Sequence, residues 1–277
     1  MNENVKIAIL SDNRSVEPFE SEHGFSIVVK TPDRKILFDT GQFGVIFRNA
    51  GKLDIDLDKV DTIVLSHGHY DHSGSVAEVL QENLHSEVYL HSATFLPRYS
   101  IREGEAKSVQ MALEDREAII TYDESQIHWT FAPRNITSEI GVTGPIPRKT
   151  AFEDTGGLFF LDPEGHEPDP IADDQGLWVR TPKGLVVCVG CSHSGIINIL
   201  NYVLEVSGAE KIHTLIGGFH LANASEERIS RTVEALNAFD IKHIIPCHCT
   251  GETAIEKIMK ESTSTVTVGH AGMVHFI

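Results

Sequence analysis

At 277 residues the chain is long enough for one large domain or two small ones with a sizeable buried core. Its formal net charge of −17 argues against a protein that holds nucleic acid through clustered Lys and Arg, so we expect no nucleic-acid partner. No apolar run reaches the length of a membrane span, and the first residues do not resemble a signal peptide. We therefore expect a cytoplasmic protein without membrane contact.

The chain opens with three strand candidates. Residues 5–10 have the pattern of a strand, and residues 25–29 and 35–38 are joined by a Thr-Pro-Asp-Arg turn, which predicts a hairpin. The last strand ends at Asp39, directly before Thr-Gly. An Asp in this place is commonly only a turn residue. A short helix is expected next, over residues 43–50.

The most informative stretch is His-Gly-His-Tyr-Asp-His, which places His67, His69, Asp71 and His72 within six residues. Imidazole and carboxylate groups bind zinc, iron or manganese, and catalytic sites use them in preference to closed thiolate cages. A lone loop histidine is more commonly solvated or structural. Four ligand-type residues at this spacing, however, indicate a metal site.

The segments around this motif predict how it is presented. Residues 61–65 are short, apolar and β-branched, as in a buried strand, and residues 73–83 have helical spacing after Ser73 and Ser75, either of which could cap a helix. We therefore expect the histidines on a strand-to-helix loop that turns them toward one point. Another strand is expected over residues 88–91.

Residues from about 92 to 156 are harder to assign. Proline and glycine turns punctuate them, and residues 118–122, 128–131 and 136–141 are strand candidates. The segment also carries positive charge in an acidic protein, on Arg98, Arg102, Arg134, Arg148 and Lys149. These side chains either hold an anionic substrate or are ordinary surface residues. Our candidate substrate-binding residues are Arg148, Lys149 and His23.

The second half repeats the first in outline. Residues 156–161, 176–180 and 185–189 are strand candidates, and a Thr-Pro-Lys-Gly turn joins the last two into a hairpin. The loop that follows contains Cys191 and His193 and precedes apolar residues at helical spacing. Strand, glycine, histidine and helix occur in the same order around the first motif, which predicts a second metal-facing loop with His193 as a ligand.

The chain continues with a strand over 211–216, a helix over 225–238, a strand over 243–245, a helix over 252–260 and strand-like residues 266–277. No low-complexity linker divides the halves. We therefore predict a single domain, residues 1–277, built from two βα halves with an insertion at about 92–156.

The four cysteines could suggest a zinc ribbon, because Cys188 and Cys191 are followed by Cys247 and Cys249. Residues three apart on one strand point to opposite faces, so the first pair cannot chelate together unless the strand ends between them. A disulfide is disfavoured in a reducing compartment. We expect neither a four-cysteine zinc site nor a disulfide.

Together these motifs resemble the metallo-β-lactamase superfamily, in the branch named for 7,8-dihydropterin-6-ylmethyl-4-(β-D-ribofuranosyl)aminobenzene 5′-phosphate synthase. The resemblance covers nearly the whole chain outside the insertion. It implies an α+β fold, an αββα sandwich with a one- or two-metal site at one edge of its sheets and the insertion over that site. It also implies that Asp39 supports the histidine loop, which has a physical basis because carboxylates orient metal-bound imidazoles. The motif residues are Asp39-Thr40-Gly41, His67 to His72, Asp173-Asp174-Gln175, Gly190 to His193, Gly217 to His220 and Pro246 to Gly251.

One position departs from the superfamily pattern. Many two-metal members have a bridging Asp directly after a strand-terminal Gly, and this chain has Cys191 at the position that looks equivalent. Three alternatives stay open: a bridging thiolate, substitution by His193, or one tightly bound metal. The leading ligand set is His67, His69 and His193 for one metal and Asp71, His72 and His248 for the other, with His220, Asp173 and Asp174 in reserve.

The resemblance implies a hydrolase with one or two divalent metal ions, zinc first and Mn, Fe or Mg as alternatives. Metal-bound hydroxide, oriented by Asp71, would attack a carbonyl or phosphoryl centre of a small phosphorylated or carboxylated substrate. The alternative is a transferase that joins a pterin diphosphate to an arylamine and releases diphosphate. A non-catalytic metal-binding protein is the third hypothesis. The oligomeric state is not predicted.

Overall fold

The computed structural model describes residues 5–277, which form two compact units. The first unit comprises the described residues up to Leu96, Val109–Thr130 and Gly269–Ile277, and the second comprises Pro97–Ser108 and Phe131–Val268. Each unit has its own seven-stranded sheet. No helix within residues 5–277 combines the length and the apolar character needed to span a bilayer.

The sheet of the first unit is mixed, with the strand order β17-β1-β2-β3-β4-β5-β8. The strands from β17 to β3 are antiparallel neighbours, and β3, β4, β5 and β8 run parallel. Parallel neighbours need crossover connections, and helices supply several of them here. The elements are β1 (Lys6–Ser11), β2 (Ser26–Lys30), β3 (Lys35–Phe38), α1 (Val45–Lys52), η1 (Leu57–Lys59), β4 (Thr62–Val64), α2 (Tyr70–Ser73), α3 (Val76–Glu82), β5 (Glu87–Leu90), η2 (Ser92–Phe95), α4 (Leu113–Thr121), η3 (Glu124–Gln126), β8 (Ile127–Trp129) and β17 (Val274–Phe276).

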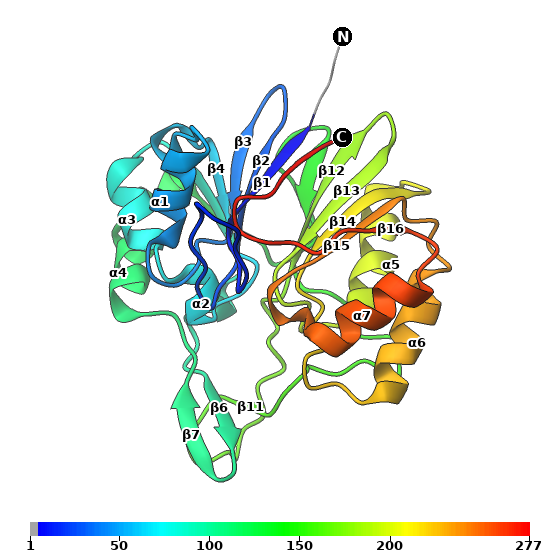
Figure 1. Ribbon diagram of the computed structural model, residues 1–277. Helices are drawn as coiled ribbons and strands as arrows, with labels where there is room; N and C mark the ends of the chain where they lie inside the picture. The colour runs from blue at the N-terminus through cyan, green and yellow to red at the C-terminus, as the bar shows by residue number, and fades with distance from the viewer. Residues whose placement is uncertain (1–4) are drawn as a thin grey trace. The chain divides into compact units, whose positions relative to one another are not determined.

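Helices α1, α3 and α4 of this unit lie along its sheet (Figure 1). Ile46 of α1, Val79 of α3 and Ile119 of α4 belong to one buried cluster with Leu37 and Ile63 of the strands. Burying such side chains supplies the main free energy that holds the helices to the sheet.

The sheet of the second unit has the order β16-β15-β14-β13-β12-β10-β9, and a separate small sheet has the order β11-β6-β7. Strands β13, β14 and β15 run parallel, so their carboxyl ends meet at one edge of the sheet. The elements are β6 (Tyr99–Arg102), β7 (Glu105–Ser108), β9 (Arg134–Asn135), β10 (Ile140–Val142), β11 (Phe159–Phe160), β12 (Gly176–Thr181), β13 (Gly184–Val189), α5 (Ile196–Ser207), β14 (Ile212–Gly217), α6 (Glu226–Leu236), β15 (His243–Pro246), η4 (His248–Thr250), α7 (Glu252–Glu261) and β16 (Thr265–Val266).

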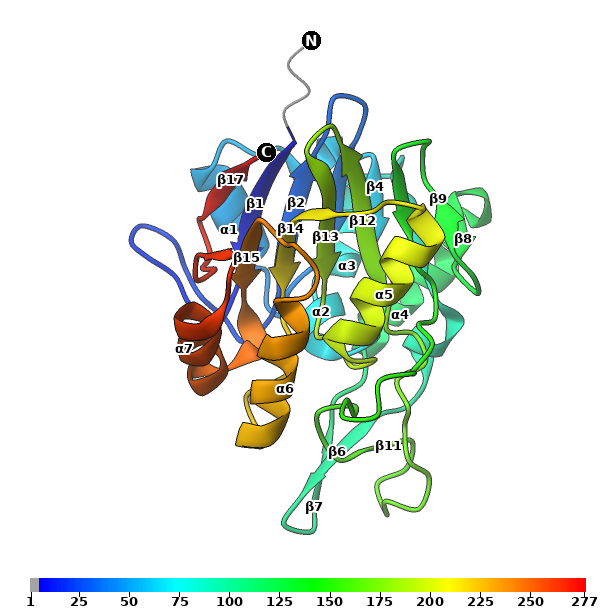
Figure 2. The same ribbon diagram turned by 90° about the vertical axis from the view of Figure 1, so that its right-hand side faces the viewer.

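The core of the second unit joins its three helices to its larger sheet. Leu200 of α5, Val233 of α6 and Ile258 of α7 share one buried cluster with Val187 of β13 and Leu215 of β14. Figure 2 shows α5 and α6 beside these strands. This shared packing holds the strand ends from which the loops after β13, β14 and β15 begin.

Three predicted elements were wrong. The strand expected over residues 136–141 is largely the turn between β9 and β10. The single helix expected over residues 73–83 is divided into α2 and α3 at Gly74, where a Cβ would lie 2.5 Å from the Gln42 carbonyl oxygen. His72 consequently lies on a short helix rather than on a loop. Residues 118–122 were expected to form a strand, but most of them belong to α4, in which Asp115 accepts a hydrogen bond from the Ala77 amide at the start of α3.

Candidate functional site

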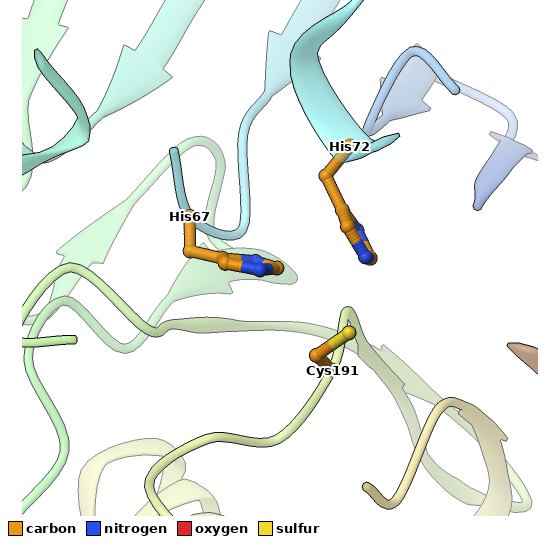
Figure 3. Close-up of side chains that lie close together, drawn as sticks. All are labelled: His67, His72 and Cys191. Atoms are coloured by element: carbon orange, nitrogen blue, oxygen red, sulfur yellow. The ribbon is translucent and has the colours of Figure 1, made fainter. Parts of the chain in front are cut away.

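The first unit carries a histidine cluster, consisting of His67, His69, Asp71 and His72. All four residues are buried, on the loop after β4 and on α2. His67 Nε2 lies 3.0 Å from His69 Nδ1, and the ring centroids of His67 and His72 are 4.3 Å apart. Two nitrogens on one tetrahedral zinc ion are separated by about 3.3 Å, so His67 and His69 lie at a ligand-like separation. Figure 3 shows His67 on its loop and His72 on its helix.

The path of the histidine loop depends on Gly68. A Cβ at this position would lie 2.1 Å from the carbonyl oxygen of Thr94, so only glycine allows the loop to pack against η2. The Tyr70 amide donates to the Val109 carbonyl at 3.2 Å, which holds the start of α2. The two flanking imidazoles are therefore placed by close backbone packing.

Asp39 lies beneath this loop, fully buried, and connects three of its groups. His72 Nδ1 donates to Asp39 Oδ2 at 2.6 Å, while the Ser66 amide and hydroxyl each donate to the same carboxylate at 2.7 Å. Because the Ser66 hydroxyl donates its only proton to Asp39, it accepts a hydrogen bond from His67 Nδ1, 2.9 Å away. Both His67 and His72 are thus held in the tautomer whose Nε2 carries the lone pair, the form that binds metals.

Asp71 contacts a residue from a distant part of the same unit. Its Oδ2 lies 3.3 Å from Nδ1 of His23, whose side chain is 60% exposed, and 4.0 Å from Nε2 of His72. The Phe25 amide donates to the Asp71 carbonyl at 3.1 Å, which joins the two segments. His23, which the sequence suggested as a substrate-binding residue, therefore contacts the Asp71 carboxylate of the histidine cluster.

The second unit carries a thiol cluster, consisting of Cys191, His193, His220, His248 and Cys249. Donor atoms of Cys191, His193 and His220 lie within 4.8 Å of one another, as do those of Cys191, His248 and Cys249. Their loops follow β13, β14 and β15, whose parallel carboxyl ends share one edge, so residues far apart in sequence meet there. Figure 3 labels Cys191 on the loop after β13.

The backbone of the thiol cluster is strained. Ser192, His220 and His248 have φ values of 57°, 48° and 47°, in the left-handed region that residues other than glycine rarely adopt. Gly156 has φ 81°, and a Cβ there would lie 2.0 Å from the His220 ring. A Cβ at Gly218 would lie 2.5 Å from Cys249 Sγ. Glycines therefore make the space in which the imidazole and the thiol sit.

His193 is held by hydrogen bonds to the segment before β11. Its ring Nδ1 donates to the Thr155 carbonyl at 2.8 Å, which leaves the lone pair on Nε2. The backbone carbonyl of His193 accepts from Arg148 Nη1 at 2.6 Å. Its ring also meets Phe159 edge-on, with 5.2 Å between centroids, and lies 4.4 Å from the ring of His220. This arrangement orients His193 as the Asp39 contact orients His72.

Cys249 was missed as a candidate ligand from the sequence, although it lies next to His248 in a Cys-x-Cys loop. Burial opposes ionisation of this thiol, but hydrogen bonding with Cys191 and the proximity of His220 and His248 lower its pKa well below the usual range. By contrast, burial alone raises the pKa of Cys188 on β13. All four cysteines are free thiols in the structure.

The two reserve carboxylates have protein partners of their own. Asp173 forms a two-pronged ion pair with Arg98, which is fully buried and also lies 2.8 Å from Asp169. Asp174 accepts from the Ser194 amide at 2.6 Å, and burial raises its pKa to about 6. In the described chain neither belongs to a donor cluster. They anchor the segments around the thiol cluster instead.

The two basic residues predicted to bind substrate, Arg148 and Lys149, have other contacts in the structure. Arg148 donates to the carbonyls of His193 and Pro170, so its guanidinium positions backbone. Lys149 is 74% exposed and lies 3.7 Å from Glu205, as an ordinary surface residue does. Neither side chain is therefore well placed to bind an anionic substrate, and other basic residues of the second unit are better candidates.

Comparison with known proteins identifies the family. The sequence profile of the Metallo-beta-lactamase superfamily matches residues 22–203. The 7,8-dihydropterin-6-methyl-4-(beta-D-ribofuranosyl)-aminobenzene-5'-phosphate synthase of Methanocaldococcus jannaschii is 31% identical over 286 residues, covering 98% of this chain and 96% of the relative. The crystal structure of Tm1679, a metal-dependent hydrolase of the beta-lactamase superfamily, is 32% identical with a TM-score of 0.85 over 99% of both chains.

A more distant structure supports the fold alone. The metallo-beta-lactamase fold protein YhfI from Bacillus subtilis has a TM-score of 0.60 at 11% identity and covers 99% of this chain and 100% of its own. The predicted resemblance and the predicted α+β fold class are thus confirmed. The chain belongs to the metallo-beta-lactamase superfamily.

Proposed function

We propose that the protein is a metal-dependent hydrolase that cleaves a carbonyl or phosphoryl bond of a small anionic substrate with one or two divalent metal ions, zinc first. The observation that carries the proposal is the histidine cluster, in which Asp39 and Ser66 hold His67 and His72 with Nε2 as the lone-pair nitrogen. Members of this superfamily typically bind divalent metals.

The donor chemistry of each unit fits such ions. The histidine cluster offers imidazoles and one carboxylate, and the thiol cluster offers imidazoles and thiols. In the thiol cluster His220 Nδ1 is buried and makes no hydrogen bond within the described residues, as expected of a nitrogen suited to a metal. We keep the ligand set inferred from the sequence, with His67, His69 and His193 for one ion and Asp71, His72 and His248 for the other.

A divalent ion bound by these residues would supply Lewis acidity and lower the pKa of water toward 7. The chain's own groups do the positioning. Asp39 and the Thr155 carbonyl fix the tautomers of His72 and His193, and Asp71 presents a carboxylate that can orient water or take its proton. His23 lies 3.3 Å from that carboxylate and is exposed enough to pass the proton to solvent.

The proposal leaves the position of Cys191 open among three alternatives. Its thiolate would serve as a ligand of both ions, His193 would take the place of the missing carboxylate, or a single ion would bind tightly. The number of metals per chain, measured by plasma mass spectrometry, separates the third alternative from the first two.

The test is the substitution His69→Ala with His85→Ala as its control, because His85 is an exposed histidine of the same unit outside the cluster. Loss of one ligand should lower the metal-to-protein ratio and abolish hydrolysis of 4-nitrophenyl acetate and 4-nitrophenyl phosphate together. The control should keep both. Turnover by metal-free protein, or a full metal complement in His69→Ala, would refute the assignment.

A second candidate function is transfer, favoured by the synthase relative that is 31% identical over nearly the whole chain. Here the protein would join a pterin diphosphate to an arylamine and release diphosphate, and the metal would stabilise the leaving group. Reactions in water enriched in oxygen-18 distinguish the two. Hydrolysis places the label in the product, whereas transfer forms a pterin–arylamine product without it.

A further inference from the structure

The second unit contains a cavity of about 850 Å³, within the size range of small-molecule sites. We propose that this cavity binds the phosphate group of a small organic phosphate and thereby holds the substrate for the proposed metal-dependent reaction. The residues that carry this proposal are Arg102, Phe152, Thr155, Gly156, Arg228 and Arg231, which all line the cavity.

Positive charge gathers in this cavity although the chain has a net charge of −17. Of its three arginines, Arg228 is buried and paired with Asp154, so each neutralises the other. Arg102, at the end of β6, forms no ion pair within residues 5–277. Its guanidinium is therefore available to an anion from solution.

Arg231 is presented differently but is equally suited to an oxyanion. Its guanidinium carbon lies 4.5 Å from the centre of the Phe152 ring, and stacking on the ring leaves the N–H groups at its edge directed outward. Its pairing with Glu227 is long, at 4.0 Å, and the side chains are 48% and 81% exposed, so this ion pair competes weakly with a ligand. Two arginines of this kind match the charge of a phosphate dianion.

The cavity shares a wall with the thiol cluster. Thr155 lines the cavity, and its carbonyl accepts the hydrogen bond from His193. Gly156 also lines it and lies against the His220 ring. A phosphate held by Arg102 and Arg231 would therefore place the rest of the molecule along the segment that orients two candidate metal ligands. Binding energy from such a remote group can be used at the reacting centre.

Titration calorimetry with benzylphosphonate tests the inference, because this phosphate analogue has no bond that a hydrolase can cleave. The wild-type protein should bind it, and Arg102→Gln and Arg231→Gln should each weaken binding by about tenfold, the loss of a charged hydrogen bond. Arg134→Gln, a change at an exposed arginine of the same unit outside the cavity, should bind as the wild type does. Phenylacetate, a carboxylate of similar size, should bind more weakly.

Absence of binding to the wild-type protein would overturn the inference, as would an affinity equal to that of the wild type in both arginine variants. Phenylacetate binding as tightly as the phosphonate would overturn the choice of phosphate. The inference rests on the proposed function but fails separately from it. His69→Ala should lose metal and still bind benzylphosphonate, whereas a cavity without affinity leaves metal content unchanged.

Discussion

The histidine cluster and the thiol cluster present similar donors but hold them by different means. In the first, one buried carboxylate, Asp39, receives hydrogen bonds from His72 and from both polar groups of Ser66. In the second, strained backbone at His220 and His248, together with close-packed glycines, sets the positions. The first cluster should therefore be sensitive to side-chain chemistry, and the second to backbone shape.

The largest expected effect is that of Asp39→Asn in the histidine cluster. The amide has one acceptor in place of two, so part of the buried network loses its partner, and the free energy of unfolding should fall by roughly 3–5 kcal/mol. Metal affinity should fall about 10- to 100-fold. Urea denaturation and metal titration measure the two effects.

Asp54→Asn is the matched control for this change. Asp39 has a positive φ of 59°, and Asp54 has a similar one of 55°, but the side chain of Asp54 is exposed. Both substitutions keep a residue type that tolerates this backbone conformation. If the two substitutions lower the free energy of unfolding equally, the side-chain hydrogen bonds of Asp39 do not stabilise the histidine cluster. The two clusters would then not differ in how their donors are held.

An intermediate effect is expected for Gly156→Ala in the thiol cluster. The left-handed φ alone costs about 1–2 kcal/mol, and displacement of the His220 ring adds about 1–3 kcal/mol. Gly208→Ala isolates the first cost, because Gly208 has φ 66° and nothing lies within 4 Å of a Cβ there. Equal losses of unfolding free energy in the two variants would show that the contact with His220 does not contribute to stability.

The smallest expected effect on stability, about 1 kcal/mol, is that of Cys249→Ser. Thiolates favour softer metals, so the substitution should weaken zinc about tenfold and remove part of the near-ultraviolet sulfur-to-metal absorption of the cobalt-substituted protein. Cys188→Ala, in the core of β13, should leave that absorption intact. An unchanged spectrum in Cys249→Ser would mean that the Cys249 thiol is not a ligand of the metal.

The sequence predicted most of the strands, because buried β-branched runs are local signals. It did not predict the break at Gly74, which arises from contact with Gln42, a residue distant in the chain. Nor could local pattern show that α4 forms where a strand was expected, since its place depends on packing beside α3.

The same limit applies to the candidate site. Cys249 was not among the predicted ligands, because the four-cysteine site was set aside on a strand argument that concerns Cys188 and Cys191 and says nothing about Cys249, a loop residue. The partners of Asp173 and Asp174 lie 75 and 20 residues away in the chain, on Arg98 and Ser194, and no spacing rule connects them. Long-range ion pairs and hydrogen bonds of this kind are visible only in the folded chain.

The chain enters and leaves each unit more than once, and this bears on how the protein is made. The first sheet takes its edge strand β17 from residues Val274–Phe276, where Phe276 pairs with Lys6 of β1. A growing polypeptide on the ribosome cannot complete that sheet until residues 274–276 have emerged. Deleting β17 should therefore damage the portion that was synthesised first.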